Sequence, residues 1–128
     1  MEFNSNIAVG MQNEVHGSVM AENTAKTVGS GTLAVFATPA MAALMERAAA
    51  ELCQPGWTTV GTSLSIKHRA ATPVGCAVRA AAEVTAVDGR NITLKITAYD
   101  EHEEIGAGIH ERVAVMTEKF MAKTERKR

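Results

Sequence analysis

The sequence predicts an α+β fold in which one amphipathic helix packs against a five-stranded antiparallel sheet. Three observations lead to this prediction. Apolar residues recur at helical spacing along residues 40–52, the apolar period changes to two after Gly56, and Asp88-Gly89 signals a hairpin between two alternating segments. One helix followed by four consecutive strands is typical of a two-layer α+β domain.

Composition limits the classes of protein to which the chain can belong. Its 128 residues fit one domain, with flexible ends expected at residues 1–10 and 120–128. Only 4% of the residues are aromatic and the net charge is -1, which favours extra burial between subunits and argues against nucleic-acid binding. No apolar run approaches about 18 residues and no signal peptide is evident, so we expect a cytoplasmic protein without membrane contact. Cys53 and Cys76 have no metal-ligand spacing, so buried free thiols and no metal are expected.

The chain begins with a predicted strand at residues 11–20, and residues 21–31 read as one helical turn and a loop. The long helix is predicted to start at Thr38-Pro39, with the Thr38 hydroxyl as N-cap and Pro39 in the first turn. Pro55-Gly56 ends it. Its expected buried stripe comprises Met41, Leu44, Met45, Ala48, Ala49 and Leu52.

Four strands follow: one at residues 58–69, one at 75–87, a return strand after Asp88-Gly89, and a last one at 105–116. Alternation gives each strand one apolar face. A type I′ turn centred on Asp88-Gly89 is expected to join the middle pair. The predicted inner faces are Val60, Thr62, Leu64, Ile66 and His68; then Cys76, Val78, Ala80, Ala82, Val84 and Ala86; then Ile92, Leu94, Ile96 and Ala98; then Ile105, Ile109, Val113 and Val115. A sheet wrapped around one central helix is the hotdog architecture, which this element order fits.

Three side chains are candidates for chemistry, and each also has a structural interpretation. His68 ends an apolar strand face, where it is either a structural histidine or a base at a pocket rim. Thr38 is either a helix cap or a hydroxyl placed where a helix N-terminus stabilises an anion. Glu46, about two helical turns further on, is either a solvated charge or a residue bordering the same cavity.

Other polar features carry less information. Gly61 is a strand glycine that would allow a ligand or a backbone to approach closely. The run His110-Glu111-Arg112 places three polar groups in a strand, where cross-strand ion pairing explains them. The basic tail at residues 119–128 is either a solvated terminus or a basic rim that attracts the phosphates of a nucleotide-bearing substrate. There is no nucleophile elbow and no P-loop.

Several separated segments resemble the fluoroacetyl-CoA thioesterase family and its thioesterase-like relatives. The likeness covers residues 11–125. It is carried by ENTAKTVGSG (22–31), FATPAMAALMERAA (36–49), VGTSLSIKHRAATPVG (60–75), AYDEHEEIGAGIHERVAV (98–115) and EKFMAKT (118–124).

This resemblance implies a hotdog homodimer, or a dimer of dimers, with active sites at the subunit interface. It implies Thr38, Glu46 and His68 as the catalytic set. Gly61, whose N–H faces the thioester carbonyl, and Arg112 are expected to contact or border the substrate. Phe36 joins them as a substrate-binding residue, in the loop at residues 22–37 that is expected to wall the acyl pocket.

The resemblance stops short of the family's acyl specificity. The lid phenylalanines that sense fluorine in the fluoroacetyl-specific enzyme are matched here by Gly29 and Thr32. We therefore predict hydrolysis of a small acyl-CoA, not selectively fluoroacetyl-CoA, with His68 as general base and no cofactor beyond the CoA of the substrate. A non-catalytic acyl-CoA or small-ligand binding module is the alternative function, and hydration of an enoyl-CoA is a third.

Overall fold

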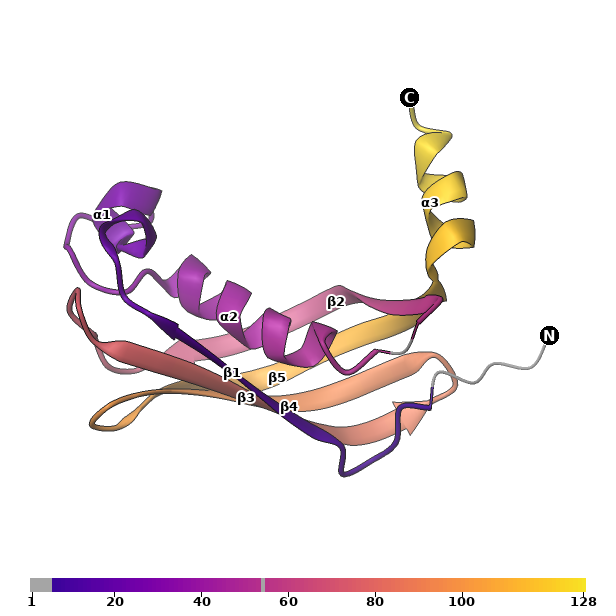
Figure 1. The fold of residues 1–128 in the computed structure, drawn as a ribbon, viewed down its shortest axis with the longest axis horizontal. Helices are drawn as coiled ribbons and strands as arrows, with labels where there is room; N and C mark the ends of the chain where they lie inside the picture. The colour runs from indigo at the N-terminus through magenta and orange to yellow at the C-terminus, as the bar shows by residue number, and fades with distance from the viewer. Residues whose placement is uncertain (1–5, 54) are drawn as a thin grey trace.

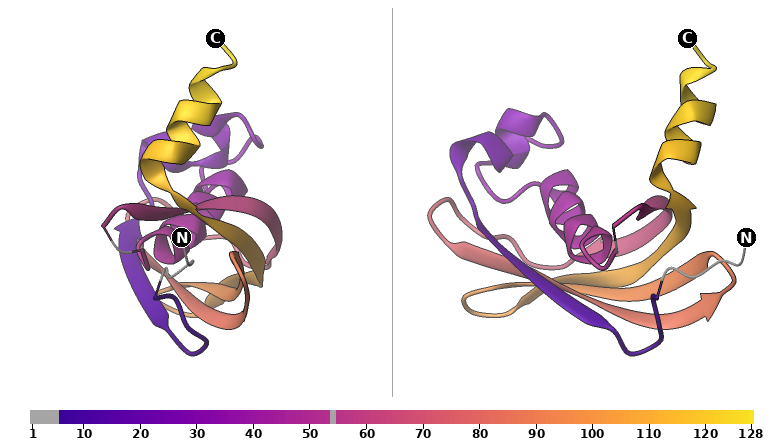
Figure 2. Two further views of the ribbon diagram at one scale, coloured as in Figure 1. Left: turned by 90° about the vertical axis from the view of Figure 1, so that its right-hand side faces the viewer. Right: turned by 45° about the vertical axis from the view of Figure 1, so that its right-hand side comes forward.

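The computed structural model describes residues 6–53 and 55–128, and in them it shows the predicted α+β fold (Figure 1). The strand order is β1-β3-β4-β5-β2, with antiparallel neighbours throughout. The sheet curves around helix α2 (Figure 2). The elements are β1 (Gln12–Ser18), the 3-10 turn η1 (Ala21–Asn23), α1 (Ala25–Val28), α2 (Thr38–Ala50), β2 (Trp57–His68), β3 (Ala77–Asp88), β4 (Asn91–Asp100), β5 (Glu104–Met116) and α3 (Thr117–Glu125).

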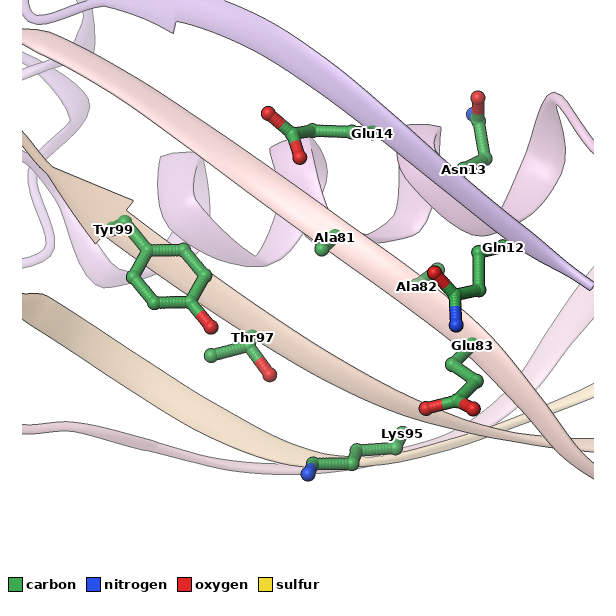
Figure 3. A pocket seen from close by; sticks show the side chains of 9 residues that line it. All are labelled: Gln12, Asn13, Glu14, Ala81, Ala82, Glu83, Lys95, Thr97 and Tyr99. Atoms are coloured by element: carbon green, nitrogen blue, oxygen red, sulfur yellow. The ribbon is translucent and has the colours of Figure 1, made fainter. Parts of the chain in front are cut away.

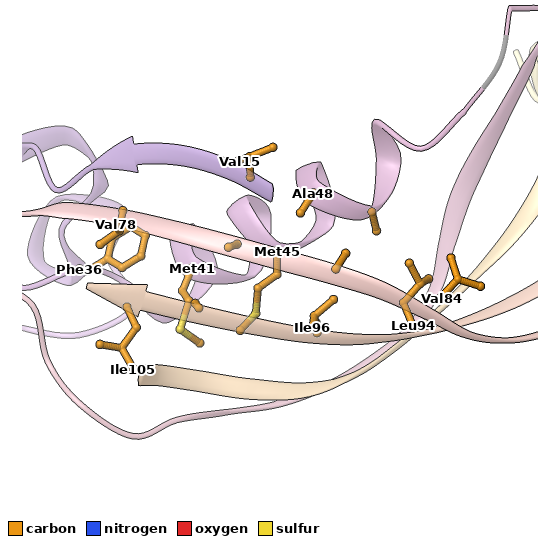
Figure 4. Packing of buried hydrophobic residues seen from close by; sticks show 14 of the residues in the cluster. Val15, Phe36, Met41, Met45, Ala48, Val78, Val84, Leu94, Ile96 and Ile105 are labelled. Carbon is orange, nitrogen blue, oxygen red and sulfur yellow. The ribbon is translucent and has the colours of Figure 1, made fainter. Parts of the chain in front are cut away.

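The core lies between α2 and the inner face of the sheet (Figure 4). Helix α2 buries Met41, Met45, Ala48 and Ala49, which belong to the predicted stripe. Leu44 of this helix and Leu52, which follows its end, are half-buried and pack against this core. Each large apolar side chain that leaves water here contributes roughly 1.5–3 kcal/mol. The sheet contributes Val78, Ala80, Ala82, Val84, Ile92, Leu94, Ile96, Ala98, Ile105 and Ala114.

The start of α2 differs from the prediction. Ala37 is the N-cap, and no side chain caps the helix. Thr38 is already the first helical residue, and its hydroxyl bonds to the His68 ring instead of a first-turn N–H. Ala37 has no side-chain oxygen, so no side chain accepts a hydrogen bond from the first-turn N–H groups of α2. The Thr38 hydroxyl is therefore free to bond to His68.

Strand β2 contains a bulge that the predicted alternation missed. Its pairing with β5 shifts register between Gly61 and Ser63. Because a bulge adds one residue, the inner face changes parity there. Thr59 is buried before the bulge, while Leu64 and His68 are half-buried after it. Assigning Val60 and Thr62 to one face with His68 was therefore wrong.

The inner face of β5 was also predicted with the wrong parity beyond Ile105. His110 and Arg112 are buried at 1% and 6% exposure, whereas Ile109 is 51% exposed. The cause is an irregular register between Ala98 and Tyr99, where β5 carries an extra residue opposite β4. Val113 and Val115, which were assigned to the inner face with Ile109, are half-buried on the other one.

Two smaller differences concern β3 and its hairpin. The register shifts again between Val84 and Ala86, so Ala86 is exposed instead of buried. The β3–β4 hairpin forms, but Asp88 still pairs with Asn91. Its two-residue turn therefore starts at Gly89, whose φ of 60° suits glycine. A turn centred on Asp88-Gly89 was thus wrong by one residue.

The C-terminal segment forms helix α3, which the sequence analysis did not anticipate. It projects from the end of β5 away from the sheet (Figures 1 and 2). All nine of its residues are exposed, including Phe120 at 37% and Met121 at 46%. Flexibility of residues 1–10 and 120–128 stays a prediction, and residues 1–5 lie outside the described part of the chain.

Candidate active site

The structure brings two of the predicted catalytic residues into direct contact. The Thr38 hydroxyl oxygen lies 2.8 Å from Nδ1 of His68. Thr38 opens α2, and His68 is the last residue of β2. The contact joins a helix N-terminus, where backbone N–H groups favour negative charge, to an imidazole that can exchange a proton with the hydroxyl.

The other nitrogen of His68 is unusual. Among the described residues, Nε2 is covered from solvent and has no hydrogen-bond partner. Burial lowers the pKa of His68, and the backbone of Ala70 opposes that shift. The Phe36 ring stands edge-on to the imidazole, with centroids 6.5 Å apart. Burial of His68 therefore favours the neutral imidazole, which is the form that can accept a proton.

A pocket of about 260 Å³ opens at this pair. Its lining residues come from the loop before α2, the start of α2 and the end of β2. They are Ala25, Ser30, Val35, Phe36, Thr38, His68, Arg69, Ala70 and Ala71. The loop at residues 22–37 thus walls the pocket, as expected from the sequence.

Glu46 lies in a second group of residues. Its Oε2 is 3.3 Å from Nη1 of Arg112 and 3.8 Å from Nε2 of His110. Arg112 also donates from Nε to the Thr59 hydroxyl and from Nη2 to the Thr59 carbonyl, both at 2.7 Å. The carboxylate therefore faces a buried guanidinium whose remaining edges are occupied.

Gly61 belongs to this second group. A Cβ on Gly61 would lie 2.7 Å from Oε2 of Glu46 and 3.2 Å from Cε1 of His110. Any side chain at this position would push the carboxylate away from Arg112. The sequence predicted a close approach of a ligand or a backbone to Gly61, whereas within this chain the nearest group is the side chain of Glu46.

Within one chain the two groups are far apart. Glu46 lies about 12 Å along α2 from Thr38 at 1.5 Å per residue. Gly61 lies about 23 Å along β2 from His68 at about 3.3 Å per residue. The structure therefore joins Thr38 to His68, and Glu46 to Gly61 and Arg112, but does not join one pair to the other in a single chain.

His110 is the residue that the sequence analysis missed at the site. From the sequence, the run His110-Glu111-Arg112 was explained by cross-strand ion pairing. The structure instead places it beside Arg112 on the inner face of β5, with Nε2 3.0 Å from Nη1. The spacing of His110 and Arg112, two residues apart in a strand, is the signal that they share a face.

A separate pocket lies on the opposite face of the sheet from α2 (Figure 3). It measures about 390 Å³ and is lined by polar residues of β1, β3 and β4, among them Glu14, Glu83, Lys95 and Tyr99. It contains neither Thr38 nor His68. Within residues 6–53 and 55–128, no cluster of His, Cys, Asp and Glu suits a metal ion. No helix in this part of the chain is long and apolar enough to span a membrane.

Comparison with known proteins finds relatives with a known class of activity. The fluoroacetyl-CoA thioesterase of Streptantibioticus cattleyicolor is 43% identical over 97 residues, which cover 73% of this chain and 70% of that protein. A solved structure of the fluoroacetyl-CoA thioesterase FlK matches with a TM-score of 0.86 and 33% identity, over 95% of this chain and 98% of that one. A thioesterase superfamily member from Thermus thermophilus matches with a TM-score of 0.84 and 26% identity, over 94% and 92%.

The fold and these relatives together define a hotdog-fold thioesterase. The family described as fluoroacetyl-CoA-specific thioesterase matches residues 19–118, most of the chain. The protein therefore belongs to that family. The predictions of the hotdog fold and of this family are confirmed.

Proposed function

We propose that the protein hydrolyses the thioester of a small acyl-CoA, at a site that two chains build together. Family membership confirms the predicted class of activity, thioester hydrolysis. The observation that carries the site is the 2.8 Å contact between the Thr38 hydroxyl and Nδ1 of His68, in a pocket of about 260 Å³. The small size of the acyl group is carried over from the resemblance of the sequence to its family.

A homodimer is supported by the edge of the sheet. β2 is an edge strand of 12 residues, and edge strands of this length are usually covered or paired. Pairing β2 with its counterpart in a second chain satisfies the edge. It also runs the two strands in opposite directions, so the His68 end of one chain approaches the Gly61 region of the other.

The bulge in β2 allows a register of this pairing that brings the two groups together. Directly opposed residues in antiparallel strands point to the same face. A two-fold axis that places Ser65 opposite its own counterpart pairs Lys67 with the partner's Ser63. Because the bulge holds one extra residue, the next position pairs His68 with the partner's Gly61, and both face inward. The partner's Glu46, which contacts that glycine in its own chain, then faces Thr38 and His68.

In this composite site the reaction needs only water as co-reactant. The Thr38 hydroxyl passes its proton to Nδ1 of His68 and takes a proton from a water molecule, whose oxygen attacks the thioester carbonyl carbon. The N-terminus of α2 and the partner's Gly61 N–H stabilise the oxyanion, at a few kcal/mol for each well-placed donor. The carbon–sulfur bond breaks, and the proton on His68 passes to the CoA sulfur. Thr38 and the partner's Glu46 orient the water. A covalent route, in which Thr38 or Glu46 accepts the acyl group first, uses the same groups.

Fluoroacetyl selectivity is not part of this proposal. Gly29 and Thr32, which stand where the fluorine-sensing phenylalanines are expected, are both exposed in the loop before α2. Phe36 is 3% exposed and packs on His68, so it forms a fixed wall of the pocket. We expect acyl groups of similar size to be hydrolysed at comparable rates. The cytoplasmic location and a dimer of dimers remain predictions from the sequence.

Complementation between inactive variants tests the composite site. His68→Ala and Glu46→Gln are expected to be nearly inactive alone, because a positioned base typically contributes 10²- to 10⁴-fold. When the two variants are refolded together, hybrid dimers contain one intact site. Since about half of random dimers are hybrids, about a quarter of wild-type activity should return. Activity is measured as release of the CoA thiol, followed with a thiol-reactive dye.

The matched control mixes Thr38→Ala with His68→Ala, whose lesions fall in the same half of the site. Every site in those hybrids keeps a lesion, so activity should not return. A mixture of His68→Ala and Glu46→Gln that stays inactive despite forming hybrids would show that both residues serve one chain. Wild-type activity of His68→Ala alone would overturn the reaction scheme.

A further inference from the structure

The imidazole of His110 lies in the middle of the core. It is 1% exposed, and its neighbours across β2 and β4 are Leu64 and Leu94. Burying an imidazole among leucines costs stability unless its ring nitrogens are hydrogen-bonded. No step of the proposed reaction uses His110, so its two polar contacts require an explanation.

Those contacts define which ring nitrogen carries the proton. Nδ1 lies 2.8 Å from the carbonyl oxygen of Ser63, which can only accept, so Nδ1 is the donor. Nε2 is then an acceptor, and Nη1 of Arg112 donates to it at 3.0 Å. A second proton on Nε2 would point at a guanidinium that has no acceptor. Burial also lowers the pKa of His110, as does the charge of Arg112, against opposing effects of Ser63 and Glu46.

Arg112 links His110 to the carboxylate of Glu46. Nε and Nη2 of Arg112 are held by Thr59. Nη1 has two N–H groups, one for Nε2 of His110 and one for Oε2 of Glu46 at 3.3 Å. The guanidinium is therefore fixed on every edge, while the Glu46 side chain is 44% exposed and depends on Arg112 for its position.

We propose that His110 is a positioning residue, which holds Arg112 and through it keeps the Glu46 carboxylate over Gly61. The inference deepens the proposed function and rests on the role of Glu46 in it. His110 contacts no reacting atom. It accepts one N–H of Arg112, so that the other N–H remains directed at Glu46.

Two substitutions of His110 separate its polar role from its volume. His110→Phe keeps the bulk of the ring but removes both nitrogens. We expect kcat to fall about tenfold, in line with the loss of an outer-shell partner, with KM changed less than about twofold. His110→Gln keeps a donor for Ser63 and an acceptor for Arg112, and should retain more than about half of kcat. Leu94→Ala is the control, since it loosens the same region of the core and should lower Tm with little change in kcat.

A double-mutant cycle tests whether His110 acts through Glu46. In a Glu46→Gln background, His110→Phe should cause no further loss of kcat, because the group that it positions is already gone. A loss that multiplies with that of Glu46→Gln would overturn the inference and leave the proposed function intact. If Glu46→Gln alone keeps wild-type kcat, the role of Glu46 in the proposed function fails instead.

A measurement on the unaltered protein covers the case in which His110→Phe does not fold. The chain has four histidines, so ¹⁵N-histidine spectra of the wild type can be assigned with single variants. At about pH 7, His110 should carry its proton on Nδ1 and leave Nε2 bare. The opposite tautomer, or a doubly protonated ring, would overturn the inference, since neither can accept the Arg112 N–H.

Discussion

The pair Thr38–His68 and the cluster around Glu46 are built in opposite ways, although α2 contributes to both. The pair has one hydrogen bond between its side chains, an exposed threonine, and a ring nitrogen without a partner among the described residues. The cluster buries a guanidinium that contacts Thr59, His110 and Glu46. One group is loosely satisfied and the other is held by several hydrogen bonds.

This difference follows from what each group does in the proposed reaction. A base must exchange its proton, so a fully satisfied imidazole would be a poor one. The side-chain partner of His68 is the Thr38 hydroxyl, which can itself both donate and accept a proton. A carboxylate that orients water must instead stay in place, and a fixed guanidinium provides that preorganisation. In the proposed reaction, Thr38 and His68 thus transfer the proton, and the cluster around Arg112 holds the Glu46 carboxylate in place.

The largest expected effect is the presence or absence of a disulfide between two chains. It tests whether paired β2 strands bring Thr38 and His68 of one chain close to Glu46 of the other. With Ser65 opposite its counterpart, Ser65→Cys should form a disulfide-linked dimer on mild oxidation, seen on a non-reducing gel. Ser63→Cys is the control. In the same register position 63 faces Lys67, so the two introduced thiols lie about 13 Å apart and should not link. Linkage through position 63 but not 65 would exclude the register, and with it the pairing of His68 with Gly61.

The next effect compares the stability that each group contributes. Arg112→Met removes the donors to Thr59, His110 and Glu46, so we expect the free energy of unfolding to fall by about 2–4 kcal/mol. His68→Ala removes one hydrogen bond and a half-buried ring, and about 1 kcal/mol is expected. Urea denaturation of both variants measures the difference. Equal losses would mean that the Arg112 cluster is no more rigid than the Thr38–His68 pair. That result would contradict the proposal that the cluster positions Glu46 while the pair transfers the proton.

Sequence pattern predicted the elements well because the core elements have strong local signals. The helical stripe through Met41 and Met45, and the alternation through Leu94 and Ile96, survive in the structure because one face of each is buried against the other. The resemblance of separated segments then supplied Thr38, Glu46 and His68 as candidate catalytic residues. Pattern alone could not distinguish these roles from those of a cap, a surface charge and a structural histidine.

The inner faces of β2, β3 and β5 could not be predicted in full, because they depend on three register shifts that no local pattern reveals. Each bulge changes the parity of a strand, so the inner face of β5 was assigned to Ile109 instead of His110. Bulges are set by pairing with a neighbouring strand, which lies far away in sequence. Counting from the buried face of β4 would have placed His110 opposite Leu94, but only with the extra residue at Ile105 already known.

The smallest expected effect is a loss of stability on mild acidification, and it distinguishes the two histidines. Burial lowers the pKa of both His68 and His110 below the ordinary value of 6.5. The unfolded chain therefore binds more protons in the window below about pH 6.5, so this stability is complete above that pH and is lost as the pH falls through it. Urea denaturation between about pH 5.5 and 7.5 should show the decline. Since His110 is enclosed beside the Arg112 cation and His68 borders an open pocket, His110→Gln should flatten the decline more than His68→Gln. A larger flattening by His68→Gln than by His110→Gln would mean that a charge is more costly on His68 than on His110. The Thr38–His68 pair would then not be the more open of the two groups.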